Sequence, residues 1–288
     1  MSLSLIDTHT HFDVPLYDAD WQVQSERADR AGVQHLVLVG YVAQHFKRMQ
    51  KRQHQIQGLA NIDLTAHIAY GLHPAYIHKH VDADLEYLAK TLSANPAIAV
   101  GEIGLDTFTD ALKADDAFAK QKRFFNAQLD LAVEHELPVM LHIRKAHADA
   151  LKILKSHAYD AHNLGGIAHS FSGGEQEADA FVRLGFKLGV TGQITNPNAK
   201  KLRRAITFAV QKHGLDCLVI ETDCPDMTPV PCQTNSNQPD RNVPANLPYV
   251  LEGLSELLTV DKVKLAETLW QNSIEALRVN WNKHDNGR

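Results

Sequence analysis

The ten residues Ala97–Asp106 read AIAVGEIGLD, an apolar run in which two acidic side chains stand near the C-terminal end. Apolar and polar residues do not alternate at its start, and this pattern is typical of a strand that is covered on both faces. The segment Leu218–Ile220 has the same character. Both segments therefore predict a parallel sheet with helices packed against it.

Short apolar or β-branched runs recur along the whole chain, and segments with apolar residues at helical spacing separate them. The alternation has no long linker or change in composition, so it predicts one α/β domain, a single (β/α)8 TIM barrel over residues 1–288. A doubly wound open sheet is the alternative fold, but no GxGxxG or GxxxxGKS-type sequence follows any run. The eight predicted strands are Leu5–Thr10, His35–Gly40, Ala66–Leu72, Ile98–Ile103, Pro138–Ile143, Gly166–His169, Phe186–Val190 and Leu218–Thr222.

Composition narrows the class of protein. Hydrophobic residues make up 44% of the chain and charged residues 22%, as in a folded globular protein, and the net charge of −5 argues against binding nucleic acid through a broad cationic surface. Three cysteines without a CxxC pair favour reduced thiols. No apolar stretch approaches the ~20 residues that span a bilayer, and the first residues lack a signal-peptide pattern, so we expect a cytoplasmic protein without a membrane partner.

Side chains of metal-ligand type stand at the C-terminal ends of the predicted strands, where barrel enzymes carry their active sites. His9 and His11 share one face of the first strand, although an isolated pair of this kind also fits hydrogen-bonded core histidines. An ionised Glu102 is costly to bury unless it is paired or bound to a cation. Six candidate ligands come from the first, fourth, fifth, sixth and eighth strands: His9, His11, Glu102, His142, His169 and Asp223.

The types of these side chains favour particular metals. Four imidazoles and two carboxylates, without a thiolate, suit Zn²⁺, Mn²⁺, Mg²⁺, Fe²⁺ or Ni²⁺. Because six ligands exceed the four of a structural zinc site, we predict two divalent ions per chain with one carboxylate shared. Glu102 is the predicted bridge, with His9, His11 and Asp223 on one ion and His142 and His169 on the other.

Six ordered motifs extend over nearly the whole chain: IDTHTH at Ile6–His11, GLHP at Gly71–Pro74, GEIGLD at Gly101–Asp106, LHIR at Leu141–Arg144, HSFSG at His169–Gly173 and ETDCP at Glu221–Pro225. Together they resemble the TatD family of metal-dependent hydrolases, the TatD-type deoxyribonucleases, and within it most closely the YjjV subgroup. The resemblance implies a barrel of the amidohydrolase type with a two-metal centre. It also implies that the family's ligands correspond to the six residues named above.

The predicted activity is hydrolysis by a water that two metal ions activate, with Asp223 as general base and Glu102 as the second catalytic carboxylate. The resemblance, and not the residue chemistry, implies a phosphodiesterase, namely a deoxyribonuclease of the 3'-5' exonuclease type acting on DNA or RNA ends. The same centre can also open a lactone, an amide or an aminoacyl-tRNA ester, so a small ester substrate is the alternative. A metal-binding protein without catalysis is a further alternative. No obligate protein partner is evident.

Two further acids lie one layer below the predicted ligands. Glu221 shares a strand face with Asp223, and Asp7 shares one with His9. Each can orient a ligand imidazole, and each can equally be a buried acid that backbone groups satisfy.

The candidate substrate contacts lie nearer the predicted mouth. Arg144 and His73 point toward it by strand alternation, and the guanidinium fork of Arg144 matches phosphate oxygens. The basic residues of Lys200–Arg204 form either a phosphate contact or a solvated helix face. We expect the proline-rich connection Pro225–Pro248 to overhang the mouth, and His78 and His80 to be surface residues.

Overall fold

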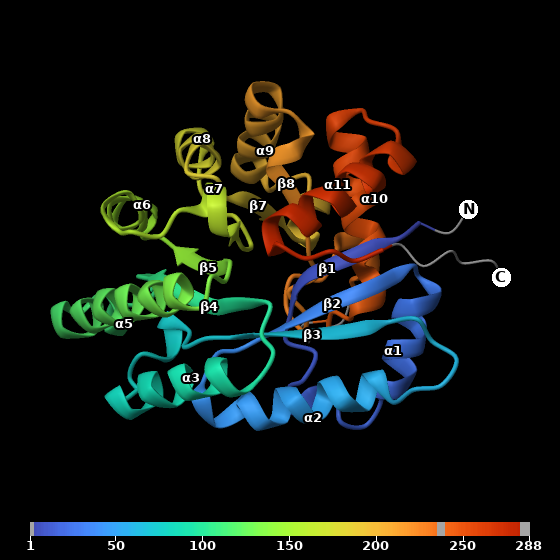
Figure 1. The fold of residues 1–288 in the computed structure, drawn as a ribbon. Helices are drawn as coiled ribbons and strands as arrows, with labels where there is room; N and C mark the ends of the chain where they lie inside the picture. Colours follow the sequence, from blue (N-terminus) through green and yellow to red (C-terminus); the bar gives the residue numbers. More distant parts are fainter. Residues whose placement is uncertain (1–2, 235–239, 283–288) are drawn as a thin grey trace.

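Eight parallel strands pair in chain order, and helices surround them (Figure 1). The structure is a computed structural model that describes residues 3–234 and 240–282. Each strand from β1 to β7 pairs with its successor, as expected for repeated strand–helix units with right-handed crossovers. The strands are β1 Leu5–Thr10, β2 Val33–Val39, β3 Thr65–Tyr70, β4 Ala99–Asp106, β5 Val139–Arg144, β6 Ile167–Ala168, β7 Lys187–Val190 and β8 Leu218–Ile220.

Backbone hydrogen bonds bring the two ends of the sheet together. The N–H of Asp223, just after β8, donates to the carbonyl oxygen of His9 on β1 at 2.9 Å. The N–H of His11 donates to the carbonyl oxygen of Cys224, also at 2.9 Å. These bonds nearly close the sheet into a ring, so the predicted (β/α)8 barrel is confirmed.

The helices lie outside this ring and follow the strands in turn (Figure 1). Within the described residues, no helix combines the length and apolarity needed to cross a bilayer. The α-helices are α1 Trp21–Arg30, α2 Phe46–Gln57, α3 Asp82–Ala94, α4 Asp110–Lys113, α5 Asp115–Glu134, α6 His147–Ser156, α7 Ala161–Leu164, α8 Glu175–Arg183, α9 Lys200–His213, α10 Leu247–Leu258 and α11 Lys262–Leu277. The short 3-10 helices are η1 Pro15–Tyr17, η2 Ala43–His45, η3 Pro74–Tyr76, η4 Gly192–Thr195, η5 Leu215–Cys217, η6 Val230–Cys232 and η7 Pro244–Asn246.

The apolar core has two parts, as a covered barrel requires. A large cluster of buried side chains fills the space between strands and helices, and the aromatic residues Phe46, Phe124 and Phe181 belong to it. A smaller cluster lies with the strands and the end of α11, and its members are Val37, Val39, Ala69, Ala99, Met140, Ile167, Val219, Ala276 and Leu277. Apolar packing therefore occupies the strand interior, while polar side chains gather at the C-terminal ends.

β1 has its predicted bounds and the other seven strands differ from theirs; three of these differences bear on the site. β6 and β8 are shorter than expected because the backbone soon leaves the extended region, with φ of 41° at Ser170 and 52° at Asp223. β4 is longer and stays paired as far as Asp106. Gly104 permits this extension, since its φ is 141° and a Cβ there would lie 2.1 Å from the carbonyl oxygen of His142. The longer strand brings a second carboxylate to the C-terminal mouth.

Candidate metal centre

A cavity of about 740 Å³ opens at the C-terminal ends of the strands. This is the end of the barrel at which the sequence predicts the site. Pro225 and Met227 also line it, so the start of the proline-rich connection borders the mouth, while residues 235–239 lie outside the described part of the chain. The ligand-type residues that line the cavity are His11, His73, Glu102, Asp106, His142, His169, Asp223 and Asp226.

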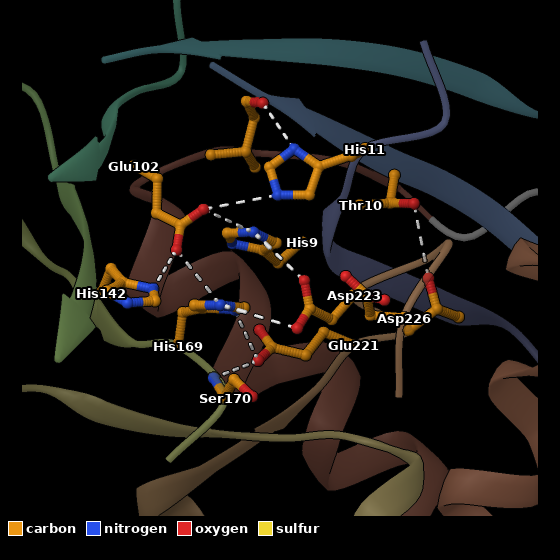
Figure 2. A network of polar contacts seen from close by, with 12 residues as sticks. His9, Thr10, His11, Glu102, His142, His169, Ser170, Glu221, Asp223 and Asp226 are labelled. Carbon is orange, nitrogen blue, oxygen red and sulfur yellow. Dashed lines mark hydrogen bonds and ion pairs between the residues drawn. The ribbon is translucent and has the colours of Figure 1, made fainter. Parts of the chain in front are cut away.

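The carboxylate of Glu102 is the centre of this cluster, and its two oxygens face different imidazoles (Figure 2). Glu102 is 1% exposed and lies in the middle of β4. Its Oε2 lies 3.3 Å from Nε2 of His9 and 3.4 Å from Nε2 of His11, both from the β1 end of the barrel. This side of the carboxylate and the β1 histidines form one three-residue group that can hold a metal ion.

The other oxygen of Glu102 faces one histidine on β5 and two that follow β3 and β6. Oε1 lies 2.7 Å from Nδ1 of His142, 3.1 Å from Nε2 of His73 and 3.3 Å from Nε2 of His169. His73, Glu102 and His142 form a second group with ligand atoms close enough for one ion. One carboxylate therefore separates two sets of imidazoles, which is the arrangement that a bridging ligand needs.

Asp223 lies between the two sets. Its Oδ1 is 3.8 Å from Nε2 of His9, and its Oδ2 is 3.9 Å from Nε2 of His169. The rings of these two histidines stack with centroids 3.5 Å apart. Asp223 is 8% exposed and lines the cavity, so its carboxylate can meet both a bound ion and a substrate. The structure thus brings all six predicted ligands together.

Backbone and carboxylate acceptors orient two of the imidazoles. His11 donates from Nδ1 to the carbonyl oxygen of Val39 at 3.0 Å, and His169 donates from Nδ1 to Oε1 of Glu221 at 3.0 Å. Both rings therefore carry a hydrogen on Nδ1 and direct Nε2 toward Glu102. Glu221 also accepts the N–H of Ser170 at 2.5 Å.

Glycine makes room for the Glu221 carboxylate. A Cβ at Gly189 on β7 would lie 2.5 Å from Oε1 of Glu221. The residue type on β7 thus helps to position the acid that holds His169. The sequence predicts that Glu221 orients a ligand imidazole, and the structure brings its carboxylate to one.

The variant Glu221→Gln is expected to weaken divalent-metal affinity by about 10- to 100-fold, because the amide is a poorer acceptor for the N–H of His169. Competition titration with a chromogenic chelator measures this. Glu267→Gln, an exposed glutamate on α11, is the matched control and should bind metal like the unchanged protein. Equal affinities for both variants would show that Glu221 does not act through His169.

Asp7, the other predicted deeper acid, has a different place. It accepts hydrogen bonds from the N–H of Thr222 at 2.8 Å and from the Thr222 hydroxyl at 2.6 Å. Within the described residues, its carboxylate contacts no imidazole ring. Burial raises the pKa of Asp7 to about 7, against the effect of these hydrogen bonds. Asp7 therefore links β1 to the segment after β8.

Asp106 is a site residue for which no role is predicted from the sequence. Its Oδ2 lies 2.9 Å from Nε2 of His142, and its Oδ1 accepts the N–H of Phe108 at 2.8 Å. Nδ1 of His142 faces Glu102 at 2.7 Å and Nε2 faces Asp106, so both ring nitrogens donate to carboxylate oxygens. Alternation along the strand puts Asp106 on the same face as Glu102, and this pattern indicates a second acid at the site.

His73 differs from the other histidines of the cluster. Its Nδ1 accepts the N–H of Ala75 at 2.9 Å, so the hydrogen of the neutral ring is on Nε2 and points at Glu102. In this tautomer His73 is a hydrogen-bond donor toward the cavity. His80 donates from Nε2 to the carbonyl oxygen of His73 at 2.9 Å and is 1% exposed. The expectation that His80 is a surface residue is therefore wrong, while His78 is exposed as expected.

The charge of Glu102 and the charges of the imidazoles around it stabilise one another. Burial disfavours the ionised form of Glu102, but the imidazoles of His73, His169 and His9 outweigh it and hold the pKa of this carboxyl well below its usual value. Burial likewise opposes the charged form of His169, yet the carboxylates of Glu221, Asp223 and Glu102 raise its pKa to about 10. Without metal, the centre is therefore an ionised glutamate held by at least one imidazolium.

The pKa values of His9 and Asp223 shift in the opposite sense, toward the neutral form of each group. Burial and the neighbouring His169 lower the pKa of His9 to about 3, so this ring is neutral and keeps a lone pair. Burial raises the pKa of Asp223 to about 6, although His169 and His11 oppose the rise. A carboxylate with such a pKa is mostly ionised at neutral pH and can still accept a proton.

Buried polar atoms without partners test whether a metal fits. Both ring nitrogens of His9 and Oε2 of Glu102 are fully buried and accept or donate no hydrogen bond within the described residues. Such atoms are costly to leave unsatisfied, and a divalent cation satisfies them. The nitrogen and oxygen donors suit the borderline and hard divalent metals, so the residues present fit metal ions.

The rim of the cavity carries cationic and aromatic side chains. The guanidinium of Arg144 lines the cavity and stacks 3.5 Å above the ring of Phe108, which is 46% exposed. Tyr41 and Tyr76 also line the cavity, with ring centroids 5.4 Å apart. The cavity therefore offers a planar cation and flat apolar faces above the polar cluster.

Comparisons with known proteins agree with the motifs. Residues 6–278 match the family described as TatD related DNase. The uncharacterized metal-dependent hydrolase YjjV of Escherichia coli K12 is 37% identical over 281 residues, which cover 97% of this chain and all of that protein. The 3'-5' ssDNA/RNA exonuclease TatD of a Rahnella strain is 32% identical over 238 residues, 82% of this chain and 84% of that protein. The crystal structure of YjjV superposes with a TM-score of 0.84 at 36% identity, covering 97% of this chain and 100% of YjjV.

Proposed function

Because the chain belongs to the TatD family of metal-dependent hydrolases, we propose that it removes nucleotides from the ends of single-stranded DNA or RNA by hydrolysing phosphodiester bonds. The observation that carries the proposal is the cavity itself. Its polar floor gathers six ligand-type side chains around Glu102, and its rim presents a guanidinium and flat aromatic faces. Relatives named as 3'-5' ssDNA/RNA exonucleases support the choice of substrate.

We infer that two divalent ions bind on the two sides of Glu102. His9 and His11 face Oε2, and His142 and His169 face Oε1. Divalent cations at such a centre act as Lewis acids, which acidify water and stabilise negative charge on phosphoryl oxygens. Loss of the protons on the ring nitrogens of His11, His142 and His169 that face Glu102 would free these nitrogens for this binding.

The protein's own groups then divide the remaining work. Asp223 accepts the proton of the attacking water, since its carboxylate lines the cavity and its raised pKa is still compatible with ionisation at neutral pH. Arg144 binds a non-bridging phosphate oxygen through its guanidinium fork. The N–H of Ala75 donates to Nδ1 of His73, so the hydrogen of this ring is on Nε2. His73 can therefore donate from Nε2 to the reacting group.

The side chains at the rim favour a nucleotide substrate over a small aliphatic ester. Tyr76 is 36% exposed beside Tyr41, and both rings border the cavity. Aromatic side chains stack on nucleobases with about 1–3 kcal/mol per base. A lactone or an amide would use the metal centre but would leave these faces without a partner.

The test is a substrate panel with the purified protein and added Mn²⁺, Mg²⁺ or Zn²⁺. A single-stranded oligonucleotide labelled at its 5' end should shorten one nucleotide at a time. A γ-lactone and an aminoacyl ester should react at least tenfold more slowly by kcat/KM. Turnover of the lactone or ester without shortening of the oligonucleotide would overturn the proposal and favour the small-ester alternative. Metal binding without turnover of any substrate would favour a protein that only binds metal.

A further inference from the structure

A second cavity adjoins the catalytic one. It has a volume of about 320 Å³, and both cavities are lined by Ser170, Ser172 and Met227. An extended ligand that leaves the metal centre on the β6 side can therefore continue into the second cavity. Neither the predicted ligands nor the substrate contacts described above lie in this second cavity, apart from the cations at the start of α9.

The lining of the second cavity is rich in polar groups without partners. Thr191 is 3% exposed, and its hydroxyl forms no hydrogen bond with residues 3–234 or 240–282. The side-chain amides of Gln193 and Asn198 line the same cavity and are likewise without a hydrogen bond in the described part of the chain. The hydroxyl of a buried residue, beside one half-buried and one exposed amide, can donate hydrogen bonds to a ligand with several acceptor oxygens.

Positive charge is concentrated at the same place. Lys200 and Lys201 line the cavity, no acidic side chain does, and neither lysine forms an ion pair within the described residues. Lys201 donates to the carbonyl oxygen of Ser172 at 3.4 Å, and it also lines a neighbouring cavity with Glu177. In a protein with a net charge of −5, two exposed lysines beside the catalytic cavity give a local positive charge. Arg203 does not contribute, because it donates to the carbonyl oxygen of Ile194.

We propose that this second cavity binds the phosphate next to the scissile one in a single-stranded nucleic acid, and this inference rests on the proposed function. Lys200 and Lys201 supply the charge, and Thr191 and Asn198 supply hydrogen bonds to the phosphate oxygens. The strand then crosses the mouth with its reacting phosphate over Glu102 and its neighbouring phosphate over the start of α9. A substrate with a single phosphate cannot use the second cavity, so the site favours oligonucleotides over mononucleotide esters.

The double variant Lys200→Glu/Lys201→Glu tests the proposal. Two substrates are compared in Mn²⁺, a single-stranded oligonucleotide and bis(p-nitrophenyl) phosphate, which carries one phosphate. We expect the ratio of the two kcat/KM values, oligonucleotide over reporter, to fall at least tenfold, mainly through KM. The slope of log kcat/KM for the oligonucleotide against log salt should also become shallower, by about 0.7 for each phosphate that the variant no longer neutralises.

The matched control is Lys152→Glu/Lys155→Glu on α6, which changes the net charge equally at two exposed lysines. Its ratio and salt slope should equal those of the unchanged protein. If both double variants shift alike, the effect is general electrostatics and the second cavity is not a phosphate site. If the Glu variant does not fold by circular dichroism, Lys200→Gln/Lys201→Gln replaces it, and an unchanged ratio there overturns the proposal.

The experiment also separates the two proposals. If the protein without substitutions hydrolyses the reporter but not the oligonucleotide, the proposed function is wrong. If that protein shortens the oligonucleotide, and the Lys200/Lys201 variant has the same kcat/KM ratio and salt slope as the control variant, only the second phosphate site is wrong.

Discussion

The variant Glu102→Ala is expected to lose hydrolytic turnover by about 10³-fold or more and to lose metal binding at the same time. Glu102 faces five imidazoles through its two oxygens, at 2.7 to 3.4 Å. Removing it deletes the one side chain that both sets of histidines share. The loss of several kcal/mol of charge stabilisation in the transition state corresponds to this change in rate. Metal content per chain, measured by mass spectrometry after dialysis, should fall together with kcat.

Two further variants make this expectation specific. Glu134→Ala removes an exposed glutamate from α5 and should leave metal content and turnover unchanged. Glu102→Gln keeps the shape of the side chain but removes its charge, so it should also lose metal, while its circular dichroism spectrum should match that of the unchanged protein. A Glu102→Gln protein that retains its ions and its turnover would show that the carboxylate is not a ligand.

The barrel is the part of the structure that the sequence predicts most completely. Parallel strands covered on both faces are apolar without alternation, and helices between them repeat at 3.6 residues, so the two periods separate cleanly. All eight predicted strands exist. Their ends are less well predicted, because the turn at Ser170 and the glycine-dependent extension at Gly104 depend on neighbouring strands.

The candidate ligands could be predicted from the sequence for a related reason. Strand alternation and the common C-terminal edge of a parallel barrel together place side chains that are distant in sequence on one floor. His9 and Asp223 are 214 positions apart, yet backbone bonds join their segments. Hydrogen-bond partners do not follow from these two rules. Whether Glu221 or Asp7 reaches an imidazole depends on which neighbour it meets across the barrel.

A local reversal of the chain explains why the surface prediction for His80 is wrong. His78 and His80 lie in a polar stretch, which is typical of a surface loop. The 3-10 helix η3 folds the chain back, so His80 returns beneath His73 and donates to its carbonyl oxygen. A pattern of residue types contains no information about such a reversal, and only the packed structure reveals that His80 supports a residue of the site.

The variant Asp223→Asn is expected to separate catalysis from metal binding. The backbone of Asp223 has a φ of 52°, a left-handed conformation that asparagine tolerates as well as aspartate, so the variant should fold. Its amide cannot accept a proton from water, and loss of a general base lowers kcat by about 10²- to 10⁴-fold. Glu102, His142 and His169 remain, so at least one ion should still bind, and KM should change little. Steady-state kinetics and metal content measure both effects.

The pH profile distinguishes a general base from a residue that only shapes the cavity. In the unchanged protein the active form of Asp223 is the ionised carboxylate, so kcat/KM should rise with pH through the pKa of this group and fall on the acidic side of it. In Asp223→Asn that acidic limb should be absent, because the amide does not titrate. If the variant keeps the same acidic limb at reduced turnover, another group accepts the proton, and the carboxylate of Asp223 serves as a ligand alone.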